Sequence, residues 1–173
     1  MQNVILVGMP GSGKSTLGVL LAKRLGYGYI DSDSVLVAQT GKRLPELIET
    51  LGNEGFLSLE ARVNAALVVE SCVIATGGSA IYRRDAIDKM RQNGIVVYLH
   101  LSCEELSRRL GSLQQRGVVC RTGCTLPELY AERSPLYAQA ADCIVDLDGS
   151  TIEEAACRLY DKVIEKLGEN HDR

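Results

Sequence analysis

Short apolar runs recur along the chain and are separated by longer stretches with helical spacing. Most of these runs lack the alternation of apolar and polar residues, which is typical of strands buried on both faces of a sheet. The pattern predicts five strands: Asn3–Val7, Gly28–Asp31, Cys72–Ala75, 95–99 and Cys143–Asp146. Because the strands alternate with helical stretches, we expect an α/β fold in which helices flank a five-stranded parallel sheet.

The stretches between the strands carry apolar residues three and four positions apart, as the buried stripe of a helix does. One such stripe is made of Leu17, Leu20, Leu21 and Leu25. It ends at Gly26, a residue type that commonly stops helices. Further helices are predicted over 54–70, 104–110 and 153–167. Residues 111–125 hold three glycines and two arginines among polar residues, which predicts a mobile lid.

Length and charge set limits on the class of protein. The 173 residues fit one domain, which we place at 1–168, followed by a polar tail over 169–173. The 19 Lys and Arg against 22 Asp and Glu give a net charge of −3, which disfavours a general nucleic-acid binder. No apolar stretch reaches the ~18 residues of a membrane span, and the first residues do not resemble a signal peptide. We therefore expect a cytoplasmic monomer without nucleic-acid or membrane partners.

The six cysteines form no C-x-x-C pair and have no clustered histidines near them. Zinc requires about four converging nitrogen or sulfur ligands, and this spacing does not supply them. We expect reduced cysteines that act as small apolar residues. The roles of Cys120 and Cys124, which lie in the predicted lid, stay open.

The strongest signal for function lies directly after the first predicted strand. Residues 8–15 read G-M-P-G-S-G-K-S, which matches the phosphate-binding pattern G-x-x-x-x-G-K-[ST], and Thr16 follows. Glycines at these positions let backbone N–H groups surround phosphate oxygens, at the positive end of the following helix. Lys14 would neutralise the phosphates, and the Ser15 hydroxyl would complete a Mg²⁺ shell. An ordinary glycine turn is the alternative interpretation.

Two further motifs follow the second and third predicted strands. Asp31-Ser32-Asp33 and Thr76-Gly77-Gly78-Ser79 should face the phosphate site, because ligands bind at the carboxyl ends of parallel strands. One aspartate could hold Mg²⁺ through water, while the other deprotonates an acceptor hydroxyl. The glycines would let a ligand approach the backbone. A helix cap for the first motif and a plain turn for the second are the alternatives.

Taken together, the phosphate-binding loop, D-S-D, T-G-G, an arginine-bearing lid and the late E-R-S-P-L-Y resemble the shikimate kinase family over residues 3–168. The resemblance implies a P-loop NTPase fold of the nucleoside-monophosphate-kinase type. It also implies ATP and Mg²⁺ as cofactors. It assigns ATP to Gly11, Ser12, Gly13, Lys14, Ser15, Thr16, Arg109, Arg116 and Asp146. Mg²⁺ is assigned to Ser15 and Asp31.

On the acceptor side, the same resemblance implies a small hydroxyl-bearing substrate such as shikimate. Asp33 would hold the acceptor hydroxyls, Gly77 and Gly78 would offer their backbone, and Arg133 would bind the carboxylate. Lys14, Asp33 and Arg116 would then be the catalytic residues.

The chain departs from the family pattern at the acceptor side. Leu57 stands where the family has a second carboxylate-binding arginine, Ser79 replaces a glycine, and the lid reads R-G-V-V. Arg62 could compensate for Leu57 or could simply lie on a solvated helix face. A kinase of the same fold for another polyol or hydroxy acid is therefore an alternative. A nucleotide-binding module without transferase activity is a second alternative.

Overall fold

The computed structural model describes residues 2–110, 118–120 and 123–169. Five parallel strands form one sheet in the order β2-β3-β1-β4-β5. Their bounds are β1 Asn3–Val7, β2 Gly28–Asp31, β3 Cys72–Ala75, β4 Gly94–His100 and β5 Cys143–Asp146. The central strand places Ile5 between Ile74 of β3 and Val96 of β4. The predicted parallel sheet is confirmed, and β4 is one residue longer at each end than predicted.

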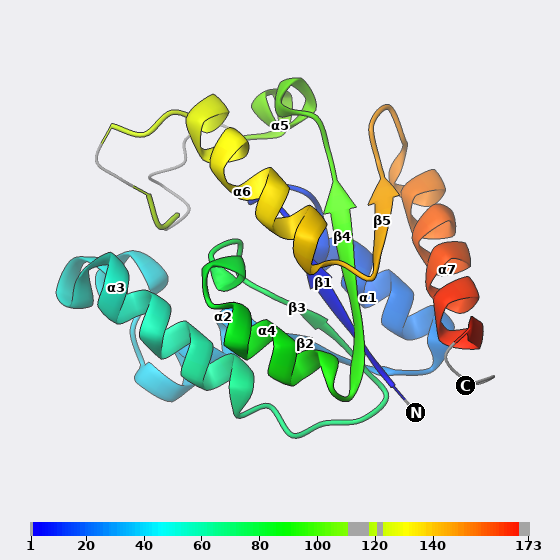
Figure 1. Cartoon of the computed structure of the whole chain (residues 1–173), viewed down its shortest axis with the longest axis horizontal. Coiled ribbons are helices and arrows are strands. Elements are labelled where there is room, and N and C mark those ends of the chain that lie inside the picture. The colour runs from blue at the N-terminus through cyan, green and yellow to red at the C-terminus, as the bar shows by residue number, and fades with distance from the viewer. Residues whose placement is uncertain (1, 111–117, 121–122, 170–173) are drawn as a thin grey trace.

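Helices cover both faces of this sheet (Figure 1). On one face, α1 (Lys14–Leu25) packs against α7 (Ile152–Glu169). On the other face, α4 (Arg84–Arg91) and α6 (Leu126–Ala140) contact β4. The pair α2 (Ser32–Thr40) and α3 (Leu44–Ala65) follows β2, at the left of the view. Two short helices, η1 (Ala80–Tyr82) and α5 (Cys103–Arg109), follow β3 and β4.

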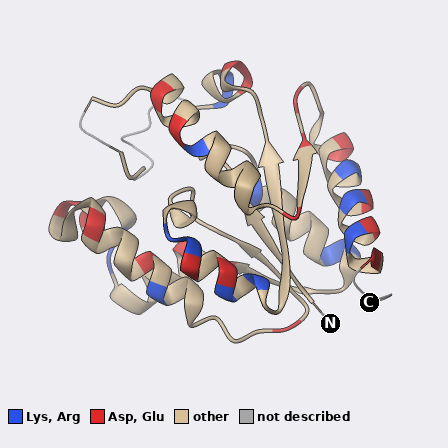
Figure 2. Cartoon of the chain, viewed as in Figure 1, with Lys and Arg blue, Asp and Glu red and all other residues tan. Residues whose placement is uncertain are grey.

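The core lies in the sheet and directly against it. Val4, Ile5 and Leu6 in β1 are fully buried, as are Val96 and Val97 in β4. These strands touch helices on both sides, which explains why their sequences lack alternation. On the outer surface, basic and acidic side chains alternate along α7 (Figure 2), where Lys162 pairs with Glu165. No helix among the described residues has both the length and the apolar composition of a membrane span.

The predicted helix over 54–70 is wrong at both ends, because α3 runs from Leu44 to Ala65. Its first turn is capped through Arg43 and Glu46, and Gly52 interrupts it with a φ of 67° and a ψ of 174°. That kink breaks the apolar periodicity, so the sequence pattern hides the earlier half of the helix. After Ala65 the helix ends; Leu67 and Val69 still pack against the core, while Val68 between them is 95% exposed.

Helices α2, α4 and α6 were not predicted. In α6, Pro135 lies inside the helix, where proline removes a backbone hydrogen bond and argues against helix. A capping box between Thr125 and Glu128 nevertheless starts α6. The other predicted helices are confirmed within two residues, as α1, α5 and α7. Of the predicted lid, residues 111–117, including Arg116, lie outside the described residues, as do 121–122 and the tail residues 170–173.

Candidate active site

A cavity of about 490 Å³ opens at the carboxyl ends of β1, β2 and β3, where parallel sheets bind ligands. The three predicted motifs supply most of its wall. Its polar and glycine lining consists of Gly11, Gly13, Lys14, Ser15, Thr16, Asp31, Asp33, Thr76, Gly77, Gly78, Ser79 and Arg133. Ten of the predicted site residues therefore converge in one place, although they come from four separate stretches of the chain.

The phosphate-binding loop has the backbone geometry that its glycines allow. Gly11 and Gly13 adopt φ values of 82° and 93°, which L-residues rarely adopt. Lys14 is buried, and its Nζ donates hydrogen bonds of 2.8 Å to the carbonyls of Gly8 and Met9. Burial lowers the pKa of Lys14 to about 8, against the opposing charges of nearby carboxylates. An anionic phosphate in the cavity would stabilise the charged ammonium further.

Ser15 and Asp31 meet across the cavity floor. The Ser15 hydroxyl donates to Asp31 Oδ2 at 2.8 Å, and Asp31 Oδ1 accepts from the backbone N–H of Ser34 at 3.1 Å. Asp31 therefore caps α2 and also faces the loop, so both interpretations of this residue hold. These oxygens fit Mg²⁺, which prefers oxygen ligands and takes few from the protein when nucleotide phosphates supply the others. No group of three or more His, Cys, Asp or Glu able to hold a metal occurs among the described residues.

Asp33 lies beside a second carboxylate that the motifs did not reveal. Asp33 Oδ1 and Glu60 Oε1 lie 2.7 and 2.3 Å from the point where a side chain on Gly77 would begin. A side chain at Gly77 would therefore displace one or both carboxylates. Burial raises the pKa of Asp33 to about 6, and the neighbouring Asp31 charge adds to this while Lys14 opposes it. A carboxylate of that pKa suits proton abstraction near neutral pH.

Glu60 itself is 2% exposed. Its Oε2 accepts a 2.8 Å hydrogen bond from the Ser79 hydroxyl, while its Oε1 has no hydrogen-bond partner among the described residues. Burial raises the pKa of Glu60 to about 7, and the charge of Asp33 adds to this. A fraction of Glu60 therefore carries a proton near neutral pH.

On the far wall, α6 buries Arg133, which is 1% exposed. Its Nε donates to the hydroxyl of Tyr82 at 3.0 Å, and its Nη2 donates to the carbonyl of Val119 at 2.5 Å. Its Nη1 lies 3.1 Å from the point where a side chain on Gly78 would begin. The same helix holds Gly78 in place, because the Tyr137 hydroxyl donates to its carbonyl at 2.5 Å.

Leu57 and Arg62 supply no second cation to this cavity. Leu57 is buried and lines a second cavity of about 350 Å³ together with Tyr82, Val119 and Glu132. Val119 lines both cavities. Arg62 is exposed on the outer face of α3. Lys14 and Arg133 are the cationic residues that line the main cavity among the described residues.

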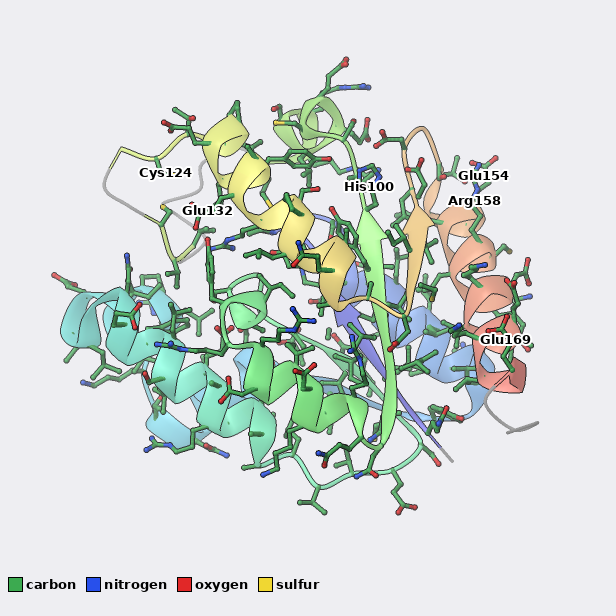
Figure 3. All side chains as sticks on the ribbon, in the orientation of Figure 1. His100, Cys124, Glu132, Glu154, Arg158 and Glu169 are labelled. Atoms are coloured by element: carbon green, nitrogen blue, oxygen red, sulfur yellow. The ribbon has the colours of Figure 1, made fainter. Side chains whose placement is uncertain are left out.

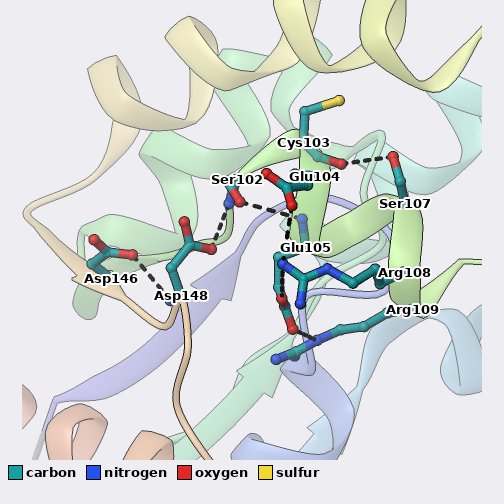
Figure 4. Close-up of polar contacts among 9 residues, drawn as sticks. All are labelled: Ser102, Cys103, Glu104, Glu105, Ser107, Arg108, Arg109, Asp146 and Asp148. Atoms are coloured by element: carbon teal, nitrogen blue, oxygen red, sulfur yellow. Dashed lines mark hydrogen bonds and ion pairs between the residues drawn. The ribbon is translucent and has the colours of Figure 1, made fainter.

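Arg109 and Asp146 do not line the main cavity, but one hydrogen-bond network connects their elements (Figure 4). Asp146 accepts from the backbone of Asp148, and Asp148 accepts from the backbone of Ser102. Glu105, whose N–H bonds the Ser102 hydroxyl, accepts from Arg109 at 3.0 Å. Leu110 then packs against Gly11, so this network borders the phosphate-binding loop.

The motifs missed two residues that contact the cavity lining: Glu60, which accepts from Ser79, and Tyr82, which accepts from Arg133. A signal existed for Glu60, since it follows Phe56 by four positions and interrupts the apolar stripe of α3. A charged residue on a buried helix face indicates a polar site more often than a packing position. Tyr82 carried no such signal, because its role depends on α6, which lies 50 residues further along the chain.

Comparison with known proteins supplies the last observation. The sequence model of the family described as "Shikimate kinase" matches residues 10–165. The chain is 38% identical to a shikimate kinase of Thiobacillus denitrificans, over 94% of this chain and 90% of that protein. It is 40% identical to one of Pseudomonas syringae pv. tomato, over 86% and 88% of the two chains. A solved structure of a shikimate kinase from Acinetobacter baumannii in complex with shikimate covers 98% of this chain, and the chain covers 94% of that structure, at 29% identity and a TM-score of 0.78.

Proposed function

This chain belongs to the shikimate kinase family, and we propose that it transfers the γ-phosphate of ATP to a hydroxyl of shikimate. The observation that carries the proposal is that Lys14, Asp33 and Arg133 line one cavity. This transfer requires three groups: one that binds phosphate, one that accepts a proton and one that binds the anionic end of the acceptor. Each of them comes from a different element of the fold.

Phosphoryl transfer depends mainly on positioning and on neutralising charge. Lys14 would leave the carbonyls of Gly8 and Met9 to bind the transferred phosphate. The N–H groups at the start of α1 would bind the remaining phosphate oxygens. A bound Mg²⁺, held through Ser15 and Asp31, would neutralise part of the phosphate charge.

Asp33 is proposed as the group that orients the acceptor hydroxyl and takes its proton. Its carboxylate faces the cavity, and its raised pKa keeps it basic enough to accept a proton near neutral pH. The proton moves from the hydroxyl oxygen to a carboxylate oxygen of Asp33 as the oxygen bonds to phosphorus and the bond to ADP breaks.

The opposite end of the acceptor would lie against Gly77, Gly78 and Arg133. The guanidinium is buried and donates to the neutral oxygens of Tyr82 and Val119, so a carboxylate would be its first anionic ligand. We also propose that Arg116, in the predicted lid, contacts the transferred phosphate. Arg109 and the loop at Asp146 would contact the adenine. The monomeric state and cytoplasmic location stay predictions.

A different small hydroxy acid or polyol is the second candidate for the acceptor. Leu57 and the exposed position of Arg62 favour it, because Arg133 is the one arginine that the described part of the chain presents to the acceptor. An anionic acceptor remains the better fit, since a buried guanidinium without an anion is costly.

ADP release in the presence of different acceptors tests this proposal. The purified protein is assayed with MgATP and shikimate, quinate, gluconate or thymidine monophosphate at equal concentrations. We expect kcat/KM for shikimate to exceed that for each other compound by at least about ten-fold, a difference of ~1.4 kcal/mol. A higher value for gluconate or quinate would support the second candidate. Equal background rates with all four would contradict kinase activity on small acids.

A further inference from the structure

The inference concerns how this chain orients Arg133, the one arginine that lines the main cavity among the described residues, and it rests on the proposed function. Arg133 is 1% exposed, and no ion pair between it and a carboxylate occurs among the described residues. An arginine side chain carries substantial rotamer freedom, so an unpaired guanidinium needs neighbours that fix its orientation. The structure supplies them at two of its nitrogens.

Tyr82 holds the guanidinium from one side. Its hydroxyl oxygen accepts from Arg133 Nε at 3.0 Å, and the guanidinium carbon lies 4.9 Å from the centre of its ring. The phenol hydrogen is directed elsewhere, because Tyr82 donates to Glu132 Oε1 at 2.7 Å. Burial raises the pKa of Tyr82, which keeps the phenol protonated and able to make both bonds.

Glu132 is the next residue to Arg133 on α6, and adjacent helical residues point in different directions. Glu132 therefore reaches the guanidinium only through Tyr82. Figure 3 labels Glu132 on α6 near the second cavity, which it lines with Leu57 and Tyr82. Hydrogen bonds thus connect Arg133, Tyr82 and Glu132 in a chain that links α6 to η1.

The hydrogen bonds of Arg133 leave one edge of the guanidinium for a ligand. Nε is bound by Tyr82, and Nη2 gives one hydrogen to the carbonyl of Val119. Nη1, beside Gly78, and the second hydrogen of Nη2 form the end-on edge that can bind a carboxylate in two places. Tyr137 also hydrogen-bonds the Arg133 side chain. Without the Tyr82 hydroxyl, the guanidinium would keep its contacts with Val119 and Tyr137 but lose the acceptor at Nε, which would loosen the direction of this edge.

We propose that Tyr82, fixed by Glu132, is a positioning residue that orients Arg133 toward the anionic group of the acceptor. Tyr82 lines the second cavity beside Leu57, where the nearby Arg83 is paired with Glu54. Arg133 is the arginine that lines the main cavity among the described residues, so the affinity for an anionic acceptor depends on its orientation. Tyr82 does not itself touch the acceptor in this proposal. It acts through Arg133.

The test is Tyr82→Phe, which removes the hydroxyl and keeps the ring. We expect KM for shikimate to rise about ten-fold, as for the loss of a hydrogen bond to a charged group, while kcat and KM for ATP change less than about two-fold. Glu132→Gln should raise KM for shikimate less, because an amide oxygen can still accept from Tyr82. Tyr160→Phe is the matched control, since Tyr160 lies on α7 against Arg24 and far from the site in sequence and fold.

A neutral acceptor separates positioning from packing. With the methyl ester of shikimate, wild type and Tyr82→Phe should have equal KM values, because the ester gives Arg133 no negative charge to bind. An unchanged KM for shikimate in Tyr82→Phe, or an equal loss with acid and ester, would overturn the inference. If wild type itself does not phosphorylate shikimate, the proposed function fails instead, and the two failures are distinct.

Discussion

The hydroxyl of Ser15 lies 2.8 Å from Oδ2 of Asp31, so the phosphate-binding loop and the end of β2 are joined by a direct hydrogen bond. Tyr29 also donates to this oxygen, at 3.4 Å. The carboxylate is thus held on the cavity floor by two hydroxyls before any phosphate enters. In the proposed function, Ser15 and Asp31 would supply oxygen ligands to a nucleotide-bound Mg²⁺.

The first prediction concerns this pair. Ser15→Ala should raise the Mg²⁺ concentration that gives half-maximal activity by about ten-fold, because one ligand and the orientation of Asp31 are lost together. A titration of activity against Mg²⁺ at saturating ATP measures this. Ser58→Ala, an exposed serine on α3, should leave the titration unchanged. A wild-type Mg²⁺ curve for Ser15→Ala would remove Ser15 from the metal site.

Lys14→Ala should lower kcat by at least about 10²-fold and weaken ATP binding, because the charge that neutralises the phosphates is lost. Lys23→Ala provides the control, since Lys23 is exposed near the end of the same helix. Steady-state kinetics with varied ATP measure both effects. Wild-type turnover in Lys14→Ala would mean that the phosphates bind elsewhere.

Asp33→Asn should lower kcat by 10²–10⁴-fold, approximately the contribution of a general base, while the affinity for ATP changes little. The amide keeps the shape of the side chain but cannot take the proton. Calorimetric titration with ATP, combined with kcat, tests both parts. Asp85→Asn on the exposed first turn of α4 is the control. If ATP affinity falls and turnover persists, Asp33 belongs to the metal site.

Because the pKa of Glu60 is raised in the folded protein, we expect the stability of the protein to depend on pH. The folded-state pKa of Glu60, about 7, lies above its ordinary value of 4.5, so the folded state binds the proton more tightly than the unfolded state does. The contribution of Glu60 to stability is therefore complete below pH 4.5 and is lost as the pH rises toward about 7. The loss amounts to roughly 3 kcal/mol, at ~1.4 kcal/mol for each pKa unit.

Glu60→Gln removes this titration and keeps the shape of the side chain. Its free energy of unfolding, measured in urea, should exceed that of wild type more at pH 8 than at pH 5. Glu49→Gln, on the exposed face of the same helix, should follow wild type at both values. An equal difference at pH 5 and pH 8 would show that Glu60 titrates as an ordinary carboxyl.

Sequence alone predicted the parts of the molecule that depend on local pattern. The strand bounds follow from continuous apolar runs, and the convergence of Lys14, Asp33 and Gly78 follows from the rule that parallel strands end at one edge. Contacts between distant helices were not predictable in this way. The hydrogen bond between Arg133 and Tyr82 joins residues 51 positions apart and requires α6 to lie against η1.

The same limit applies to α3 and to Leu57. The non-helical backbone at Gly52 breaks the apolar spacing of α3, so periodicity does not reveal the first half of this helix. Only the φ and ψ of this one residue depart from helical values, and the helix continues after it. The sequence shows that Leu57 is apolar, but only the fold shows that it faces a second cavity behind Val119. The charge of Arg62 could have compensated for the apolar Leu57, but Arg62 is exposed on α3, which argues against this role.

Product identification tests the central claim most directly. Wild-type protein is incubated with MgATP and shikimate, and the acceptor is then analysed by mass spectrometry and phosphorus NMR. The account predicts that one phosphoryl group appears on a hydroxyl of shikimate, in a one-to-one ratio with ADP, and that Lys14→Ala and Asp33→Asn both prevent it. ADP formation without phosphorylated shikimate, or phosphorylation that persists in Asp33→Asn, would contradict it.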